Sequence, residues 1–593
     1  MRSRSRTGRT RAAAAWLTLG LALALGACRG AGADRTPWSD PSSFHFPDGW
    51  EYPVDAPPAV AHHGMVASSD TLASAAGLEV LKAGGNAMDA AIAVQFALEV
   101  VHPFAGNIGG GGFAVVRTAD GKNGALDFRE KAPLAATHDM YVDSAGQVTR
   151  KSWTGPLAAG VPGSVAGMEQ LHERYGSLPW PTLLEPAIRM AREGITVRPV
   201  FHDAIARSAD RLRQFPASAA IYLPGGEPPE VGSTFRQPDL ARTLQAIADS
   251  GASFFYHGWI ADSLVAEQER DGGIITRQDL DEYRAVWRDP IVDHYRGRTI
   301  VSMPPPSSGG VTLAEMLNIL SGFDLSRMGW HSPDAIHVMV EAMRRAYGDR
   351  NYYLGDPDFV TMPIAKLTSE TYADSLRGSI DMEHASPSSA FNKVPVESTQ
   401  TTHFSVVDSA GDAVAITTTL NGGFGSAVSV RGAGFLLNNE MDDFAAQPGT
   451  PNAYGLVQGE ANAIAPEKRM LSSMTPTIVL DERGRLELVT GTPGGSTIIT
   501  SVLQVVTGQI DFGLPPQTAV NAPRFHHQNL PNRIFYEHGG LDSATIADLE
   551  SRGHELGERD GTWGDVESIY VGVDGTLYGA SDPRGGGSQS LGY

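Results

Sequence analysis

The chain has 593 residues, too many for one small domain, and 41% of them are hydrophobic and 19% charged, as in a soluble globular protein. Its formal net charge of −21 argues against nucleic acid and anionic membrane surfaces as partners, because both would be repelled by most of the protein surface. Composition shows no place to divide the chain, so we expect one large core or two tightly joined halves.

The N-terminus predicts export. A basic start, MRSRSRTGRTR, is followed by an apolar run shorter than the about 20 residues of a membrane-spanning helix. The run ends in LGAC, which resembles the lipobox of bacterial lipoproteins, and Cys28 is the only cysteine, which excludes disulfides within the chain. We expect a lipoprotein signal peptide (1–27), a tether rich in Pro, Ser and Asp (28–60), and a lipid-anchored protein in the periplasm or at the cell surface. The alternative is a plain cleaved signal with an incidental cysteine.

Two helices are predicted after the tether. Ser69 or Asp70 caps the first helix, Gly84-Gly85 ends it, and Asn86 caps the second. The second helix is apolar nearly all round, which is typical of a helix buried between layers.

Strands and helices follow in mixed order. Residues 109–130 alternate like two strands about a turn at Asp120-Gly121, and residues 298–323 predict a strand, a loop and a helix. More strands follow Thr401. This mixture, without an internal repeat, predicts a layered α/β or α+β architecture.

One stretch, VPVESTQTTHFSVVDSAGDAVAITTTLN, changes from polar residues with a proline to a strand pattern at Gln400-Thr401. A hairpin centred on Ala410 would place Thr419 opposite Thr401, since both are equally far from the turn. Such a pair can be plain cross-strand packing, and a slip of the register would remove it.

The same break has a chemical interpretation. A threonine hydroxyl is a poor nucleophile at neutral pH without a base beside it. An α-amino group, with a pKa of about 7.7–8.0, is partly neutral at pH 7, whereas a lysine near 10.4 is not. A chain cut before Thr401 would carry nucleophile and base on one residue. The hydroxyl could make that cut itself by attacking the carbonyl of Gln400.

These residues belong to a series of motifs that resembles the γ-glutamyltransferases of the N-terminal-nucleophile (Ntn) hydrolase superfamily. The resemblance runs from about residue 61 to Tyr593. Its motifs are NIGGGGF (107–113), LDFREKAP (126–133), GVPGSVAGM (160–168), PPPSSGG (304–310), TTHFSVVD (401–408), LLNNEMDDF (436–444), LSSMTPTIV (471–479), TPGGS (492–496) and APRFHHQ (522–528). It implies an α+β fold, a four-layer αββα sandwich, made as a precursor. The precursor cuts itself into a large subunit (61–400) and a small catalytic subunit (401–593) that stay associated.

The resemblance also implies catalytic roles. Thr401 is the nucleophile and, with Gln400, the processing site, and Thr419 positions and activates it. Gly494 and Gly495 form the oxyanion hole, where backbone N–H groups without side chains can approach a developing negative charge. Without the resemblance, GTPGGS is typical of a turn.

A γ-glutamyl group presents an α-carboxylate and an α-ammonium, which need opposite charges in one small pocket. The resemblance assigns Arg129, Ser472 and Ser473 to the carboxylate, and Asn421, Glu440 and Asp443 to the ammonium. Some relatives carry glutamine in place of Glu440. Taken singly, the same residues are typical of a solvated arginine, a turn and capping serines.

The segment QPGTPNAYGLVQGEAN (447–462) resembles the lid loop of many bacterial members, with Tyr454 at the gating position. The lid implies a small, occluded pocket and argues against an acylase for bulky substrates.

Three functions stay open. The leading hypothesis is a γ-glutamyl enzyme that acts on glutathione and related amides, with water, amino acids or peptides as acceptors. A glutaryl-type β-lactam acylase on the same fold, or a catalytically inactive envelope lipoprotein, are the alternatives. No cofactor or metal is expected, because NIGGGGF lacks the Lys-Ser/Thr of a phosphate loop and the adjacent pairs His62-His63 and His526-His527 do not have zinc-ligand spacing.

Overall fold

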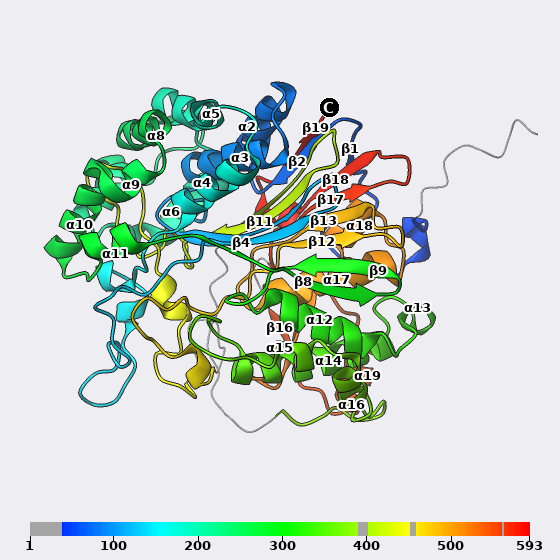
Figure 1. Cartoon of the computed structure of the whole chain (residues 1–593). Coiled ribbons are helices and arrows are strands. Elements are labelled where there is room, and N and C mark those ends of the chain that lie inside the picture. Colours follow the sequence, from blue (N-terminus) through cyan, green and yellow to red (C-terminus); the bar gives the residue numbers. More distant parts are fainter. Residues whose placement is uncertain (1–37, 389–400, 451–457, 560–562) are drawn as a thin grey trace, which may run out of the picture.

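The computed structural model describes residues 38–388, 401–450, 458–559 and 563–593, in which two seven-stranded antiparallel sheets lie face to face (Figure 1). Three of the predicted functional residues, Cys28, Gln400 and Tyr454, lie outside the described part. Two smaller sheets, β5 (Ile195–Thr196) with β6 (Thr234–Phe235), and β14 (Phe525–His526) with β15 (Ile534–Glu537) and β16 (Leu556–Arg559), lie apart from the main pair.

The first main sheet has the order β1 (Ala59–Ala61), β18 (Leu577–Ser581), β17 (Glu567–Val571), β13 (Leu486–Thr490), β12 (Thr477–Leu480), β9 (Arg298–Ser302) and β8 (Ile291–Tyr295). The second has the order β19 (Gln589–Gly592), β2 (Met65–Ser68), β10 (Thr401–Val407), β11 (Ala413–Thr419), β3 (Gly111–Arg117), β4 (Asn123–Asp127) and β7 (Val286–Arg288).

Helices cover the outer face of each sheet, so the order of layers is αββα (Figure 1). The helices α2 (Thr71–Lys82), α3 (Ala87–Val101) and α4 (Ser164–Tyr175) contact strands of the second sheet. The apolar cluster on this side also includes residues of α5 (Trp180–Glu193), α6 (Pro199–Leu212), α7 (Pro216–Tyr222), α8 (Pro238–Ser250), α9 (Ser253–His257), α10 (Trp259–Asp271) and α11 (Arg277–Glu282). The helices α12 (Gly309–Leu320) and α18 (Pro516–Asn521) contact strands of the first sheet. The apolar clusters on this side also include residues of α13 (Leu325–Met328), α14 (Pro333–Tyr353), α15 (Ile364–Leu367), α16 (Glu370–Arg377), α17 (Thr497–Ile510) and α19 (Ser543–Ser551). The predicted four-layer sandwich is confirmed.

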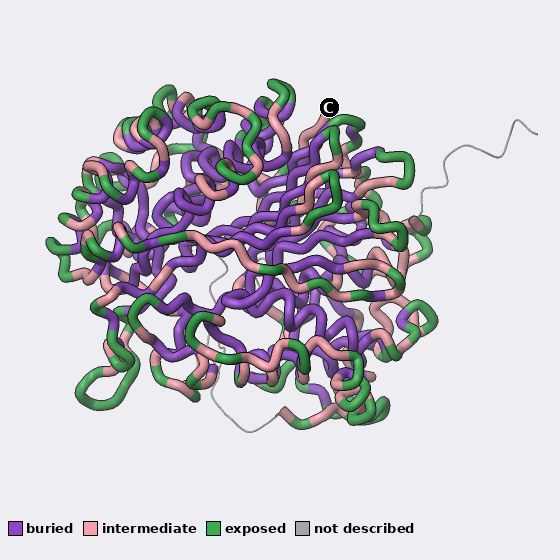
Figure 2. The backbone as a smooth tube through the Cα atoms, in the orientation of Figure 1, coloured by how far each residue is buried: buried purple, intermediate pink, exposed green. Residues whose placement is uncertain are grey.

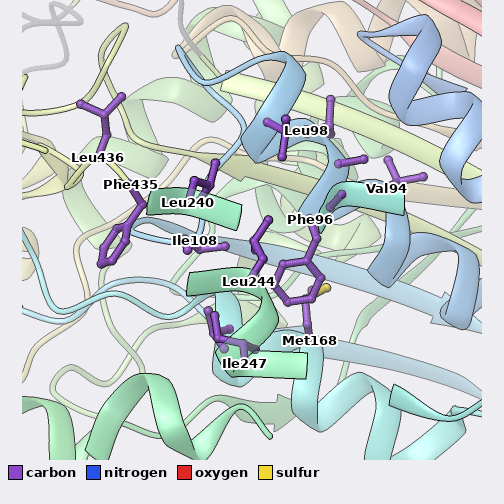
Figure 3. Packing of buried hydrophobic residues seen from close by; sticks show 14 of the residues in the cluster. Val94, Phe96, Leu98, Ile108, Met168, Leu240, Leu244, Ile247, Phe435 and Leu436 are labelled. Atoms are coloured by element: carbon purple, nitrogen blue, oxygen red, sulfur yellow. The ribbon is translucent and has the colours of Figure 1, made fainter. Parts of the chain in front are cut away.

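Three apolar clusters hold the layers together, and the strands between them are buried along most of their length (Figure 2). The cluster of the second sheet draws side chains from several helices, among them Phe96 of α3, Met168 of α4 and Leu244 of α8 (Figure 3). A cluster of smaller side chains, such as Ala67 and Val489, fills the space between the two sheets. No helix of the described residues is both long and apolar enough to cross a membrane.

The helices predicted after the tether are present with the predicted caps. Asp70 accepts the N–H of Leu72 at 2.8 Å, and Asn86 forms a capping box with Asp89. All 15 residues of α3 are buried, as expected for a helix between layers. The N–H of Ala87, at the start of α3, also donates to the Asp408 carboxylate at 2.9 Å, which ties the helix to the β10–β11 turn.

The predicted hairpin is confirmed in its register. β10 and β11 pair with Thr401 opposite Thr419, and the ladder continues without a slip to Val407 opposite Ala413. Side chains alternate along β10, so that Phe404 packs toward the helices while Thr401 and His403 lie on the face toward the other sheet.

The N-terminal segment differs from expectation. Residues 38–60, predicted as part of a tether, pack against the fold. The ring of Trp38 meets Tyr578 edge-on at 4.8 Å between centroids, Trp50 donates to the carbonyl of Asn521 at 2.9 Å, and β1 extends the first sheet. Composition favoured a tether because Pro, Ser and Asp dominate the count, but the few aromatic side chains supply the buried area that holds the segment in place.

Candidate active site

A pocket with an empty volume of about 350 Å³ lies where β10 begins and β11 ends. It gathers nine of the predicted residues: Thr401, Thr419, Asn421, Arg129, Glu440, Asp443, Ser472, Ser473 and Gly495. Gly494 precedes Gly495 in the same loop. The residues come from sequence positions more than 300 apart, so only the folded chain brings them together.

The two threonine hydroxyls face each other across the hairpin. Oγ1 of Thr401 lies 3.4 Å from Oγ1 of Thr419, and Thr401 is 7% exposed. The N–H of Asn421 donates to Oγ1 of Thr419 at 2.7 Å, with the Asn421 backbone in the left-handed region at φ 71°. Because a hydroxyl has one donor and two acceptor positions, Thr419 can accept from Asn421 and direct its proton toward Thr401.

His403, two residues along β10, is held neutral beneath the pair. Burial lowers the pKa of His403 to about 3, and its ring nitrogens lie 2.9 Å from Oγ1 of Thr417 and 3.2 Å from Oγ of Ser405. Gly491 packs against this ring so closely that a side chain there would collide with it. Both nitrogens are thus engaged by neighbours other than Thr401, and His403 fits a packing role under the strand.

The Gly494-Gly495 loop presents backbone donors. Both glycines have positive φ, 138° and 58°, and a Cβ on Gly494 would lie 2.6 Å from Oγ1 of Thr497. The N–H and Oγ1 of Thr497 donate to the Gly494 carbonyl at 3.1 and 2.8 Å, which turns the loop into α17. Within the described part of the chain, the N–H groups of Gly494 and Gly495 have no acceptor, so they can serve an anion in the pocket.

Arg129 is fully buried at the pocket wall and forms two ion pairs. Its Nη1 contacts Glu440 and its Nη2 contacts Asp443, both in the 3₁₀ turn Glu440–Asp443. Its Nε donates to the carbonyl of Met470 at 3.3 Å. The residues predicted to receive opposite ends of a substrate therefore bind each other in this structure.

Sequence reasoning missed Arg350, a fully buried residue of α14 that lines the pocket. Its Nη2 donates to Oγ of Ser473 at 3.0 Å, and its Nε donates to Oγ of Ser308 at 2.9 Å. Burial lowers the pKa of Arg350 to about 10, which leaves it cationic at neutral pH. The only sequence signal was an arginine inside a long helix with many apolar residues, and that pattern does not say what the arginine faces.

The geometry agrees with comparisons to known proteins. The model of the Gamma-glutamyltranspeptidase family matches residues 73–592. The chain belongs to the gamma-glutamyltranspeptidase family. It is 47% identical to the glutathione hydrolase proenzyme of Escherichia coli (strain K12), with 96% of this chain and 98% of that protein covered. The predicted resemblance is confirmed.

More distant relatives carry another name. The acylase ACY 1 proenzyme of Pseudomonas sp. (strain V22) is 37% identical, over 91% of this chain and 95% of that protein. The crystal structure of a cephalosporin acylase from Bacillus halodurans superposes with a TM-score of 0.82 at 31% identity, over 92% of this chain and 99% of that one. The fold is therefore shared with proteins named as acylases, and the likeness of fold does not by itself distinguish the two activities.

A second residue missed by sequence reasoning, Glu130, places a third acid beside Arg129, behind the pocket wall of this gamma-glutamyltranspeptidase. Its carboxylate is buried, lies 3.8 Å from Nη1 of Arg129, and has no hydrogen-bond partner among the described residues. Burial raises the pKa of Glu130 to about 7, and burial likewise raises the pKa of Glu440 well above its usual range. Crowded acids around one guanidinium favour keeping a proton in the cluster.

The raised pKa of Glu130 should make the stability of the fold depend on pH. The folded protein holds the Glu130 proton up to pH about 7, whereas the unfolded chain releases it near 4.5, so this group destabilises the fold progressively as pH rises between those values. Glu130→Gln, compared with wild-type Glu130 in a common Thr401→Ala background, should raise Tm at pH 8 by roughly 1 to 3 °C and change it little at pH 5.

Thermal unfolding followed by circular dichroism at both pH values measures the effect. Exposed Glu383→Gln is the matched control for the loss of one negative charge. An equal gain in Tm at pH 5 and pH 8 would contradict a buried acid that resists ionisation.

Proposed function

We propose that the chain is a γ-glutamyltransferase and glutathione hydrolase that uses Thr401 as an N-terminal nucleophile. The observation that carries the proposal is the Thr401–Thr419 hydroxyl pair in a buried pocket that holds both arginine and carboxylate side chains. The name of the E. coli relative supports the substrate class, and the word proenzyme in that name supports processing of a precursor.

The precursor cuts itself first. Oγ1 of Thr401 attacks the carbonyl carbon of Gln400, the peptide C–N bond breaks to leave an ester, and water hydrolyses the ester. This releases the α-amino group of Thr401 and restores its hydroxyl. The small subunit then begins with a residue that carries nucleophile and base together, with Thr419 orienting the hydroxyl.

The mature enzyme repeats the chemistry on its substrate. The α-amino group takes the hydroxyl proton of Thr401 as Oγ1 bonds to the γ-carbonyl carbon, and the N–H groups of Gly494 and Gly495 stabilise the oxyanion. The C–N bond breaks and the leaving amine takes the proton. Water or the amine of an amino acid or peptide then attacks the γ-glutamyl ester and frees Thr401.

Substrate recognition is an exchange of ion pairs. An α-carboxylate in the pocket replaces the acids that Arg129 now contacts, and the α-ammonium takes over Asp443 and Glu440. Asn421, Ser472 and Ser473 line the same pocket and supply further polar contacts. A zwitterionic head group brings one charge of each sign, so both Arg129 and the acidic side chains gain a partner of opposite charge in the exchange.

The acylase alternative fits the pocket less well. A glutaryl group brings a carboxylate but no ammonium, so Asp443 and Glu440 would lose their contact with Arg129 and gain no cation. Leaving buried carboxylates without a partner costs more than pairing them gains. The acylase relative is also less similar in sequence than the glutathione hydrolase, 37% against 47%.

We further propose export and lipid anchoring. The basic start, short apolar run and LGAC sequence support the proposed removal of residues 1–27, the lipidation of Cys28, and a location in the periplasm or at the cell surface. Extracellular glutathione and other γ-glutamyl compounds would be its substrates there.

The central prediction concerns the cleavage. Purified precursor should convert without added protease into two associated chains, the smaller beginning Thr-Thr-His-Phe. Thr401→Ala should stay full length and inactive, while Thr401→Ser should still process, at a changed rate. Thr419→Ala should lower activity per processed molecule. Intact mass and N-terminal sequencing identify the products.

The neighbour Thr402 provides the matched control, because its hydroxyl faces away from the pocket and contacts Oγ of Ser69 at 2.9 Å. Thr402→Ala should still process at Gln400-Thr401. An active single chain, or a small fragment that starts at any other residue, would overturn the mechanism.

A second prediction tests charge selection. Asp443→Ala should lower kcat/KM for γ-glutamyl-p-nitroanilide by about 10²- to 10³-fold, as expected when one partner of a buried charge pair is removed. Glutaryl-p-nitroanilide, which lacks the ammonium, should change by less than about 3-fold. Asp442→Ala in the same 3₁₀ turn is the control, because Asp442 does not line the pocket. Equal losses on both substrates would make Asp443 structural and strengthen the acylase alternative.

A third prediction tests the anchor. Cys28→Ser should move the enzyme from the membrane fraction to the soluble fraction and abolish incorporation of labelled fatty acid, with activity retained. Cell fractionation with an activity assay measures both. Membrane retention equal to that of the wild type would remove the lipoprotein proposal.

A further inference from the structure

Two arginines line the pocket, and their charges are compensated in different ways. Arg129 contacts Glu440 and Asp443, and Glu130 lies 3.8 Å away. Within the described residues, no carboxylate oxygen lies within 4.0 Å of Arg350. Arg129 is therefore surrounded by three carboxyl groups, whereas the hydrogen-bond partners of Arg350 are all neutral side chains.

The partners of Arg350 fix its orientation. Its Nε donates to Oγ of Ser308, which itself donates to the carbonyl of Ser472 at 2.6 Å. Its Nη1 donates to the side chain of Asn351 at 2.9 Å. Two of its three nitrogens thus bind side chains outside the pocket lining, and the third, Nη2, donates to Oγ of Ser473 at the pocket wall.

This contact determines what the Ser473 hydroxyl can do. A guanidinium only donates, so Ser473 must accept from Arg350, and its own proton is left to find another acceptor. Among the described residues no acceptor is within hydrogen-bond reach of that proton. Ser473 lines the pocket, so the hydroxyl can offer its proton to an anion there, and the adjacent guanidinium makes it a stronger donor.

We propose that Arg350 is a specificity-determining residue for the substrate α-carboxylate, acting through the Ser473 hydroxyl and supplying the positive charge that Arg129 shares among three acids. The inference rests on the proposed γ-glutamyl activity. It divides the recognition of the head group between the two arginines. Arg129 is the cation that exchanges partners when the substrate enters, and Arg350 is the cation that stays in place.

The arrangement predicts a loss that depends on the substrate. 4-Aminobutyryl-p-nitroanilide is the γ-glutamyl compound without its α-carboxylate, so it makes no use of Arg350. Arg350→Gln should raise KM and lower kcat/KM for γ-glutamyl-p-nitroanilide by roughly 10- to 100-fold, and lower kcat/KM for the 4-aminobutyryl compound by less than about 3-fold. Arg350→Lys, which keeps the charge but not the fork, should fall between the wild type and Arg350→Gln.

A double variant of Arg350 and Ser473 distinguishes a role of Arg350 in substrate recognition from a purely structural role. Ser473→Ala should show the same substrate dependence, and Ser473→Ala with Arg350→Gln should lose little more than Arg350→Gln alone, because both variants break one path to the carboxylate. If Arg350→Gln does not fold or process, Arg350→Lys and Ser473→Ala carry the same comparison.

Arg344 supplies the matched control, since it is another buried arginine of α14, pairs with Glu341, and does not line the pocket. Arg344→Gln should leave the ratio of the two substrates unchanged. A wild-type enzyme inert toward γ-glutamyl-p-nitroanilide would overturn the proposed function and this inference with it. An active wild type, with both substrates falling alike in Arg350→Gln and Arg350→Lys, would overturn the inference alone.

Discussion

The register of one hairpin decides whether this molecule has an active site. With β10 and β11 paired so that Thr401 is opposite Thr419, the two hydroxyls are 3.4 Å apart. A slip by one residue would turn Thr401 to the helix side of the sheet. The register is held by burial on both faces, by the Asp408 turn that binds the start of α3, and by β2 and β3 on either side. Packing between the layers thus fixes the positions of the two threonine hydroxyls.

The helices and strands around the hairpin could be predicted from the sequence, because the signals for them are local. Helix caps at Asp70 and Asn86 and the alternation along β10 and β11 predict their elements with the correct ends. The four layers themselves came from the resemblance and not from periodicity. The predicted tether was too long, because a few aromatic side chains such as Trp38 pack residues 38–60 against the fold despite their polar composition.

The rest of the site was beyond local patterns because its contacts join distant positions. Arg129 meets Glu440 across 311 residues, and Arg350 meets Ser473 across 123. Neither Arg350 nor Glu130 differs, as a letter in the sequence, from the many surface arginines and glutamates of an acidic chain. Their burial and their partners arise only when two sheets and α14 come together.

In this structure Arg129, Glu440 and Asp443 pair their charges with one another, and on the proposed binding mode this shapes how binding energy is used. On this proposal, a substrate replaces the ion pairs of Arg129 with Glu440 and Asp443, so its head group exchanges contacts of similar strength instead of adding new ones. Such an exchange yields modest ground-state affinity but strong discrimination, because a ligand with only one of the two charges strands a buried partner. Binding energy that is not consumed in holding the substrate remains available to the transition state, where, in the proposed mechanism, the N–H groups of Gly494 and Gly495 stabilise a charge that the ground state lacks.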